Sequence, residues 1–378
     1  MLFHLNLMNP KRLVVSISTI ALLGSLAACV RQNTPNNTAE SDPSPGAASN
    51  ELAFNNQVSV TGAGASFPNP IYQRWFQETN GEYPNLQINY QSVGSGAGVQ
   101  QFTQGTVDFG ASDVAMTDEE IAKVDRGVLL LPMTAGSIVL AYNLPGVEGE
   151  LKLSRDVYTD ILLGNITNWN DPAIAAANPD LKLPNQAITV VHRSDGSGTT
   201  GVFTMHLSAI SPEWKQQVGA DKTVDWPVGL GAKGNEGITA LLQQTAGSIG
   251  YVEYGYAKQN NLAVASLENQ TGNFIAPSAE SAGKTLEAVE LPENLRAFIE
   301  DPQGDQSYPI VTYTWLLAYK NYPDAETAKG VEAMIQYGLT QGQEYAEELG
   351  YVALPQNVRE RVAAAADNIY PEHAIDIN

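Results

Sequence analysis

The feature that most constrains the fold is a strand pattern joined to a helix pattern by a short turn of glycine and hydroxyl residues. Residues 187–191 form an apolar, strand-like run, residues 192–201 read His-Arg-Ser-Asp-Gly-Ser-Gly-Thr-Thr-Gly, and residues 202–207 are helix-like. The N–H groups of a helix's first turn lack partners within the helix, and the macrodipole adds partial positive charge there. Such a turn favours an anion, although an ordinary capped helix gives the same pattern.

Side chains within this turn strengthen the anion-binding interpretation. Arg193 supplies a planar fork of donors, and Ser197 and Thr199 supply hydroxyls. Asp195 follows the arginine by two residues and can pair with it, which would hold the guanidinium in place. The turn therefore predicts a site for a tetrahedral oxyanion.

The same strand–turn–helix pattern occurs twice more upstream. After residues 58–60, a glycine turn leads to Ser66, which we expect at the N-cap of the next helix. After residues 86–90, a second glycine turn contains Ser95, and we expect a helix from Val99. Any one of these serines could be an ordinary loop residue, but three such turns together favour a shared site.

A carboxylate is expected to join these hydroxyls. Residues 107–113 predict a strand that ends at Asp113, and ligands in open α/β sheets collect at the carboxyl ends of strands. An ionised carboxylate only accepts hydrogen bonds, so Asp113 fits an anion that still carries a proton. Asp113 could instead cap the following turn, but Thr117 is better placed for that role.

The start of the chain predicts export and lipid attachment. Residues 1–28 resemble a bacterial lipoprotein signal peptide, and small residues precede Cys29, the single cysteine of the sequence. A transmembrane anchor is the weaker alternative, because the apolar run is short and interrupted by serines. Residues 29–56 are rich in Asn, Pro, Ser and Thr and predict a flexible tether. We therefore expect a membrane-anchored lipoprotein in the periplasm or at the cell surface.

The charge balance limits the partners. Removal of residues 1–28 leaves 18 basic and 41 acidic residues, a net charge of −23. Nucleic acid and anionic lipid surfaces are therefore disfavoured. A small anion can still bind, because distant charges are screened beyond about 8–10 Å in physiological salt while local dipoles act at short range.

Five motifs occur in an order that points to one family. They are residues 62–68 (GAGASFP), 107–113 (VDFGASD), 193–199 (RSDGSGT), 226–231 (WPVGLG) and 249–257 (IGYVEYGYA). With these motifs the chain resembles the substrate-binding proteins of the phosphate-specific ABC transporter, from about Val58 to Ala365. The resemblance implies binding of inorganic phosphate with high affinity outside the cytoplasmic membrane and delivery to the permease and ATPase of that importer.

The resemblance also implies a fold and its domain limits. It is the α/β fold of the type II periplasmic binding proteins, with two lobes that each hold a central sheet flanked by helices. Lobe 1 is expected to comprise residues 57–142 and 309–378, and lobe 2 residues 143–308. Two strands, crossing near Ala141 and near Pro309, would form a hinge, and we expect a monomer.

By the same resemblance, the phosphate oxygens would be bound from both lobes. The implied binding residues are Ser66, Phe67 through its N–H, Ser95, Asp113, Arg193, Ser197, Gly198 and Thr199, with Asp195 in support and Cys29 as the lipidation site. The loop around Ser95 matches the family pattern loosely, since Ala97 stands where glycine is usual.

Other functions stay open. The chain could be a phosphate sensor or accessory scavenging lipoprotein, or it could bind another tetrahedral oxyanion. A phosphoryl-transfer enzyme would need a metal cluster or an exposed nucleophile–base pair, which the sequence lacks, so no catalysis, cofactor or metal is expected.

Some residues imitate other kinds of site. Residues 282–285 (AGKT) are similar to the end of a nucleotide-binding loop, but no strand precedes them. The histidines show no metal-ligand spacing, and a cluster of tyrosines is expected to pack at the core and hinge. These histidines are His192, His206 and His373, and the tyrosines are Tyr251, Tyr254 and Tyr256.

Overall fold

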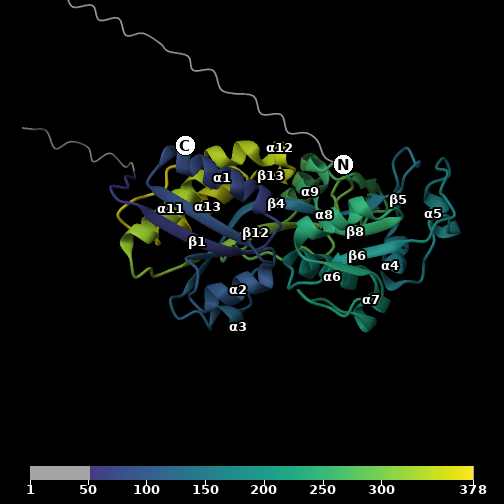
Figure 1. Cartoon of the computed structure of the whole chain (residues 1–378), viewed down its shortest axis with the longest axis horizontal. Helices are drawn as coiled ribbons and strands as arrows, with labels where there is room; N and C mark the ends of the chain where they lie inside the picture. Colours follow the sequence, from purple (N-terminus) through teal and green to yellow (C-terminus); the bar gives the residue numbers. More distant parts are fainter. Residues whose placement is uncertain (1–51, 378) are drawn as a thin grey trace, which may run out of the picture. The chain divides into compact units, whose positions relative to one another are not determined.

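A computed structural model describes residues 52–377, and the predicted signal peptide, Cys29 and residues 29–51 of the predicted tether lie outside the described residues. The described chain is an α/β protein built on a ten-stranded sheet with helices packed around it (Figure 1). The order along its main path is β2-β1-β3-β12-β4-β8-β6-β7. Two lobes share this sheet, one at each end of the path.

Lobe 1 contains the β2 end of the sheet. β1 pairs in parallel with β2 and β3, whereas β12 is antiparallel to β3 and β4. Its elements are β1 (Val58–Gly64), α1 (Asn69–Glu82), β2 (Leu86–Ser92), α2 (Ser95–Thr103), β3 (Phe109–Ser112), α3 (Asp118–Ile121), the first part of β4 (Val128–Asn143), β12 (Val311–Tyr319), α11 (Ala325–Leu339), η1 (Gln341–Tyr345), α12 (Ala346–Leu349), β13 (Tyr351–Val352) and α13 (Gln356–Ala366).

Lobe 2 contains the β7 end of the sheet and a separate small sheet. β6 pairs in parallel with β7 and β8, and β10 joins β5 and β11 in the small sheet. The elements within residues 143–308, the predicted limits of lobe 2, are β5 (Lys152–Leu153), α4 (Arg155–Leu163), α5 (Pro172–Ala177), β6 (Thr189–Arg193), α6 (Gly198–Ile210), α7 (Pro212–Gln217), β7 (Leu230–Ala232), α8 (Gly234–Gln244), β8 (Ser248–Glu253), α9 (Tyr254–Gln259), β9 (Ala263–Val264), β10 (Ser266–Glu268), β11 (Phe274–Ile275) and α10 (Ala279–Glu287).

Strand β4 belongs to both lobes. Its sixteen residues are almost all buried, as the continuous apolar run predicts for a strand covered on both faces. β4 pairs with β12 as far as Ser137 and with β8 from Ile138 onward. The exchange of partner thus lies before the crossing predicted near Ala141. The Ile138 N–H donates to the Ile310 carbonyl (2.9 Å), so the two connections between the lobes are in contact.

Local sequence explains where several helices begin. The hydroxyl of Thr117 accepts from the Glu120 N–H, and the Glu120 carboxylate accepts from the Thr117 N–H, which forms a capping box at the start of α3. This bond confirms that Thr117, and not Asp113, caps that turn. Both α2 and α6 begin one turn earlier than expected. Their first turns consist of small and hydroxyl residues without apolar periodicity, so the apolar pattern indicated a later start.

The predicted tether extends too far. Residues 52–56 were expected to be flexible, but Leu52 and Phe54 are buried against lobe 1. The Phe54 carbonyl accepts from Asn85 Nδ2, and the Ala53 carbonyl accepts from Lys329 Nζ, both at 2.8 Å. Two apolar side chains in a polar stretch are enough to anchor residues 52–56 to lobe 1.

Candidate functional site

The carboxyl ends of parallel strands from both lobes meet in one buried cluster. In lobe 1, β1 leads to Ser66 and β3 leads to Asp113, and in lobe 2, β6 ends at Arg193. Each of these side chains is at most 4% exposed. This is the edge where an open α/β sheet holds its ligands.

Ser66 does not cap α1 as expected. The helix begins at Asn69, so its N-cap position is Pro68 and not Ser66. No side chain donates or accepts a capping hydrogen bond there. The Ser66 hydroxyl turns instead toward lobe 2, where its Oγ accepts from the backbone N–H (3.0 Å) and from Nδ2 (2.9 Å) of Asn235. Ser66 is therefore a contact between the lobes.

The N–H of Phe67 lies next to this serine in the β1–α1 turn. Within residues 52–377 it donates to no protein acceptor, whereas the Phe67 carbonyl accepts from the Tyr351 hydroxyl at 2.6 Å. The Phe67 side chain is fully buried, which fixes the turn. The N–H group thus remains able to bind a ligand beside Ser66.

Ser95 and Asp113 lie together on the lobe 1 side. Ser95 is the first residue of α2, and its Oγ accepts from the Asp113 N–H at 3.2 Å. The Asp113 carboxylate accepts from Thr314 Oγ1 (3.0 Å) on β12 and from Thr199 Oγ1 (3.4 Å) in lobe 2. Thr314 could not be found from the sequence, because it lies inside an uninterrupted strand pattern.

The pKa of Asp113 is far from its ordinary range. Burial raises this pKa to about 7, although hydrogen bonds from Thr314 and the charge of Arg193 lower it in part. The carboxyl therefore titrates near neutral pH, where it can accept or donate a hydrogen bond according to its protonation state.

Arg193 and Asp195 form the ion pair that the sequence predicted. Arg193 donates from Nε to Oδ1 (2.7 Å) and from Nη2 to Oδ2 (2.6 Å) of Asp195. Burial alone would raise the pKa of Asp195, but Arg193 and the Gly234 N–H (3.1 Å) lower it below its ordinary value. Two bonds in one plane fix the guanidinium and leave its Nη1 to face Thr199.

The first turn of α6 supplies the predicted donors of lobe 2. Ser197 is its N-cap and accepts from the Thr200 N–H at 3.0 Å, so its hydroxyl hydrogen remains available. In the described chain the N–H groups of Gly198 and Thr199 donate to no protein acceptor. Thr199 Oγ1 lies 3.5 Å from Arg193 Nη1.

Only glycine fits at position 198. A Cβ there would overlap Ser95 Oγ and come within 2.8 Å of Asp113 Oδ2, so the backbone of α6 approaches lobe 1 directly. A second close approach joins the loops, where the Gly96 N–H donates to the Gly196 carbonyl at 2.8 Å. The helix start of one lobe is therefore held against the binding groups of the other.

Asn235 is a site residue that the sequence analysis missed. It is fully buried in the first turn of α8, and its Nδ2 also lies 3.3 Å from Thr199 Oγ1. A signal was available, because β7 and Gly234 repeat the strand, glycine turn and helix of the other binding turns. The apolar pattern of this helix begins only at Ile238, three residues after the asparagine, so it does not reach this turn.

The residues that imitate other sites are placed elsewhere. Residues 282–285 lie inside α10, where Lys284 pairs with Glu287 at 2.9 Å. His206 is buried between the Tyr158 hydroxyl and the Glu300 carbonyl. Among the residues that the structure describes, no group of histidine, cysteine and carboxylate side chains is arranged to hold a metal.

Two of the three tyrosines do more than pack. The Tyr251 ring stacks on Trp226 with a centroid distance of 5.4 Å, and its hydroxyl accepts from the Arg193 N–H at 3.0 Å. The Tyr256 hydroxyl donates to the Ser66 carbonyl at 2.7 Å. Both therefore support the backbone of residues in the cluster.

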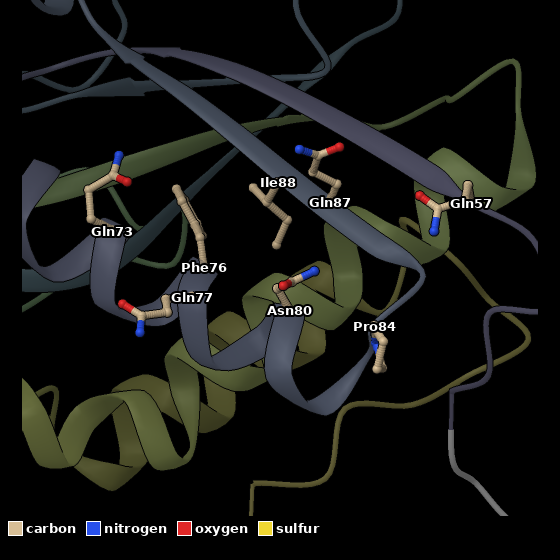
Figure 2. A pocket seen from close by; sticks show the side chains of 8 residues that line it. All are labelled: Gln57, Gln73, Phe76, Gln77, Asn80, Pro84, Gln87 and Ile88. Atoms are coloured by element: carbon tan, nitrogen blue, oxygen red, sulfur yellow. The ribbon is translucent and has the colours of Figure 1, made fainter. Parts of the chain in front are cut away.

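A separate surface hollow lies between α1 and β2 (Figure 2). It has a volume of about 500 Å³ and is lined mainly by uncharged amide side chains. The lining residues are Gln57, Gln73, Phe76, Gln77, Asn80, Pro84, Gln87 and Ile88. None of the residues of the buried cluster lines it, and it offers no cation for an anion.

Comparison with known proteins agrees with this architecture. The model of the PBP superfamily domain matches residues 37–340. The chain is 46% identical over 308 residues to the phosphate-binding protein PstS of Pasteurella multocida, which covers 81% of this chain and 89% of that protein.

Solved structures show the same fold at low sequence identity. A phosphate-binding protein from Stenotrophomonas maltophilia has a TM-score of 0.65 and 20% identity, with 82% of this chain and 94% of that chain covered. A high-affinity periplasmic phosphate-binding protein, solved with phosphate, has a TM-score of 0.67 and 19% identity, with 85% of this chain and 96% of that chain covered.

The fold and the convergent strand ends define an α/β binding protein of two lobes, which confirms the predicted fold class. The sequence identity to PstS proteins over most of the chain narrows this class to one family. The chain belongs to the PstS family of phosphate-binding proteins.

Proposed function

We propose that this protein captures inorganic phosphate outside the cytoplasm and delivers it to an ABC-type importer. The observation that carries the proposal is the buried cluster in which donors from both lobes surround the Asp113 carboxylate. The names of the family members and of the phosphate-bound neighbours support the same ligand. Ser66, Ser95, Asp113, Arg193 and Thr199 contact one another or Asn235 within this cluster. Phe67, Ser197 and Gly198 are their neighbours in the chain.

The charge of the anion is distributed over several groups. Arg193 uses Nε and Nη2 for Asp195, so Nη1 is the part of its fork that remains for phosphate. The N–H groups at the start of α6 and their helix dipole supply the rest of the positive potential. Neutral hydroxyls complete the donor set without adding charge.

Asp113 would make the site specific for an anion that carries a proton. Phosphate near neutral pH can donate its O–H to the ionised carboxylate, whereas sulfate has no proton to donate and meets a like charge. A site built to bind a substrate O–H can reject an analogue without it by about 10⁴–10⁵. This repulsion distinguishes phosphate from tetrahedral oxyanions that carry no proton.

The remaining features fit a receptor that opens and closes. For the lobes we propose the predicted limits, residues 57–142 with 309–378 and residues 143–308, with residues 52–56 added to lobe 1. They would rotate about the contact between Ile138 and Ile310. Attachment through a lipid at Cys29 would keep the receptor near the permease and ATPase. None of the helices within residues 52–377 combines the length and apolar character needed to span a bilayer.

We propose binding without catalysis. Ser197 Oγ serves as the cap of α6, and among the described residues His192, the nearest histidine in the chain, contacts the Arg193 carbonyl and not a serine of the cluster. A role as sensor or accessory scavenger would use the same site, and identification of the partner would separate it from direct transport.

The test is calorimetric titration of the folded, phosphate-free protein with phosphate and with sulfate at about pH 9, where the Asp113 carboxyl is ionised. We expect one tight phosphate site and no heat from sulfate. No heat from phosphate would contradict the proposal. Hydrolysis of p-nitrophenyl phosphate in buffer with Mg²⁺ and Zn²⁺ would show instead that the cluster is an enzyme's active site.

A further inference from the structure

The amide of Asn235 has a fixed orientation in the buried cluster. Its Oδ1 accepts from the Glu253 N–H at 3.0 Å, at the carboxyl end of β8. The Nδ2 group must then face the other way, because an amide has one acceptor atom and one donor atom. It points to two hydroxyls, Ser66 Oγ at 2.9 Å and Thr199 Oγ1 at 3.3 Å.

The two bonds from Asn235 determine what the Ser66 hydroxyl can do. A hydroxyl has two lone pairs and one hydrogen. Ser66 Oγ accepts from both the backbone N–H and Nδ2 of Asn235, which occupies both lone pairs. The hydroxyl can therefore act toward a ligand only as a donor, and donors are what an oxyanion requires.

Thr199 is oriented in the same way. Its Oγ1 receives Asn235 Nδ2 and Arg193 Nη1, at 3.3 and 3.5 Å, and its own hydrogen faces Asp113 Oδ2 at 3.4 Å. Asn235 thus sets the direction of one hydroxyl from each lobe. It can contact both only when α8 lies against the β1–α1 turn.

We propose that Asn235 is a positioning residue that turns the Ser66 and Thr199 hydroxyls into fixed donors and couples the direction of these hydroxyls to closure of the lobes. The inference rests on the proposed function, since it assumes an anion between these groups. It assigns a role in phosphate binding to α8, which lies outside the motif of residues 193–199. Glu236, the next residue, contacts Ser92 and Asn69 of lobe 1 from an exposed position and does not orient a hydroxyl of the cluster.

Asn235→Asp tests the orientation directly. The shape is kept and the Glu253 N–H retains its acceptor, but the second oxygen can no longer donate to Ser66. The Ser66 hydrogen would turn to the new carboxylate and away from phosphate. We expect phosphate affinity to fall by at least about 10³-fold, because a donor is lost and a like charge is added.

A charge-matched control separates this effect from general electrostatics. Gln244→Glu adds the same charge at an exposed position of the same helix and should leave phosphate affinity within about threefold of wild type. Equal loss of affinity in both variants would overturn the orientation argument. Thermal unfolding without phosphate verifies that each variant is folded.

A double-mutant cycle provides a readout that a merely structural role would not change. Asn235→Ala should weaken phosphate binding by about tenfold in the wild-type chain, but by less than about threefold when Ser66 is already alanine. The same factor in both backgrounds would overturn the proposal. If wild type itself binds no phosphate, the proposed function fails, and this outcome is distinct from a failed cycle in a protein that binds.

Discussion

The cluster holds one aspartate from each lobe, and the two differ in chemical character. Asp195 in lobe 2 accepts two bonds from Arg193, and its pKa lies below the ordinary value. Asp113 in lobe 1 accepts from the hydroxyls of Thr314 and Thr199, and burial raises its pKa to about 7. The same residue type thus has a lowered pKa on one side of the site and a raised pKa on the other.

This difference assigns different tasks to the two carboxylates. The charge of Asp195 is compensated, so its task is to hold the guanidinium of Arg193 in one plane. Within residues 52–377 no cation makes a direct contact with the Asp113 carboxylate, so we propose that this group responds to the proton of a ligand. On this proposal, neighbouring groups, and not the residue type, decide which carboxylate selects the anion.

The largest expected effect is on selectivity. Asp113→Asn keeps the shape and the acceptor for Thr314 but removes the charge that repels sulfate. We expect the preference for phosphate over sulfate to fall by about 10⁴-fold, measured as the ratio of calorimetric dissociation constants. Asp125→Asn, an exposed site in the same lobe, is the control. A preference unchanged in Asp113→Asn would show that this carboxylate does not select the anion.

The next effect concerns affinity on the lobe 2 side. Arg193→Ala removes Nη1 from the site and leaves Asp195 buried without its partner, so we expect phosphate affinity to fall by about 10³-fold. Arg74→Ala removes an exposed guanidinium from α1 and should change the affinity little. Tight phosphate binding by Arg193→Ala would contradict the role assigned to Asp195, because the guanidinium that it orients would then not be needed for binding.

The smallest effect is on stability. Because the pKa of Asp113 is about 7 in the folded chain and about 3.9 in an unfolded chain, the folded state binds more protons between these values. The stability of the wild-type protein without phosphate should therefore fall as the pH rises from about 4 to about 7, relative to Asp113→Asn. The relative loss is at most about 4 kcal/mol. Denaturant unfolding of both proteins at several pH values measures it, and parallel curves would contradict the raised pKa.

The contrast between the aspartates was only partly visible in the sequence. The pairing of Arg193 with Asp195 followed from a spacing of two residues in one turn, and the structure contains that ion pair. The placement of Asp113 at a strand end was also predicted. Its raised pKa was not, because it depends on burial and on Thr314, which approaches from a strand two hundred residues later in the chain.

The apolar periodicity of the sequence did not predict the correct helix start where the first turn of a helix lacks large apolar residues. Ser95, Gly198 and Asn235 all stand in first turns that the apolar periodicity does not reach. The N–H groups that we propose to bind the anion lie in these same turns, so the boundary error coincides with the proposed functional part of each helix. The role of Ser66 was misplaced for a different reason, since its partner Asn235 lies in the other lobe.

The most direct test of the account is the pH dependence of sulfate binding, because sulfate does not titrate in the relevant range. If sulfate binds only the protein in which Asp113 is protonated, its apparent affinity should fall by about tenfold per pH unit above about pH 7. Asp113→Asn should show no such slope. Equal slopes in the two proteins, or a flat wild-type profile, would contradict the claim that the proton on this carboxylate decides which anion is bound.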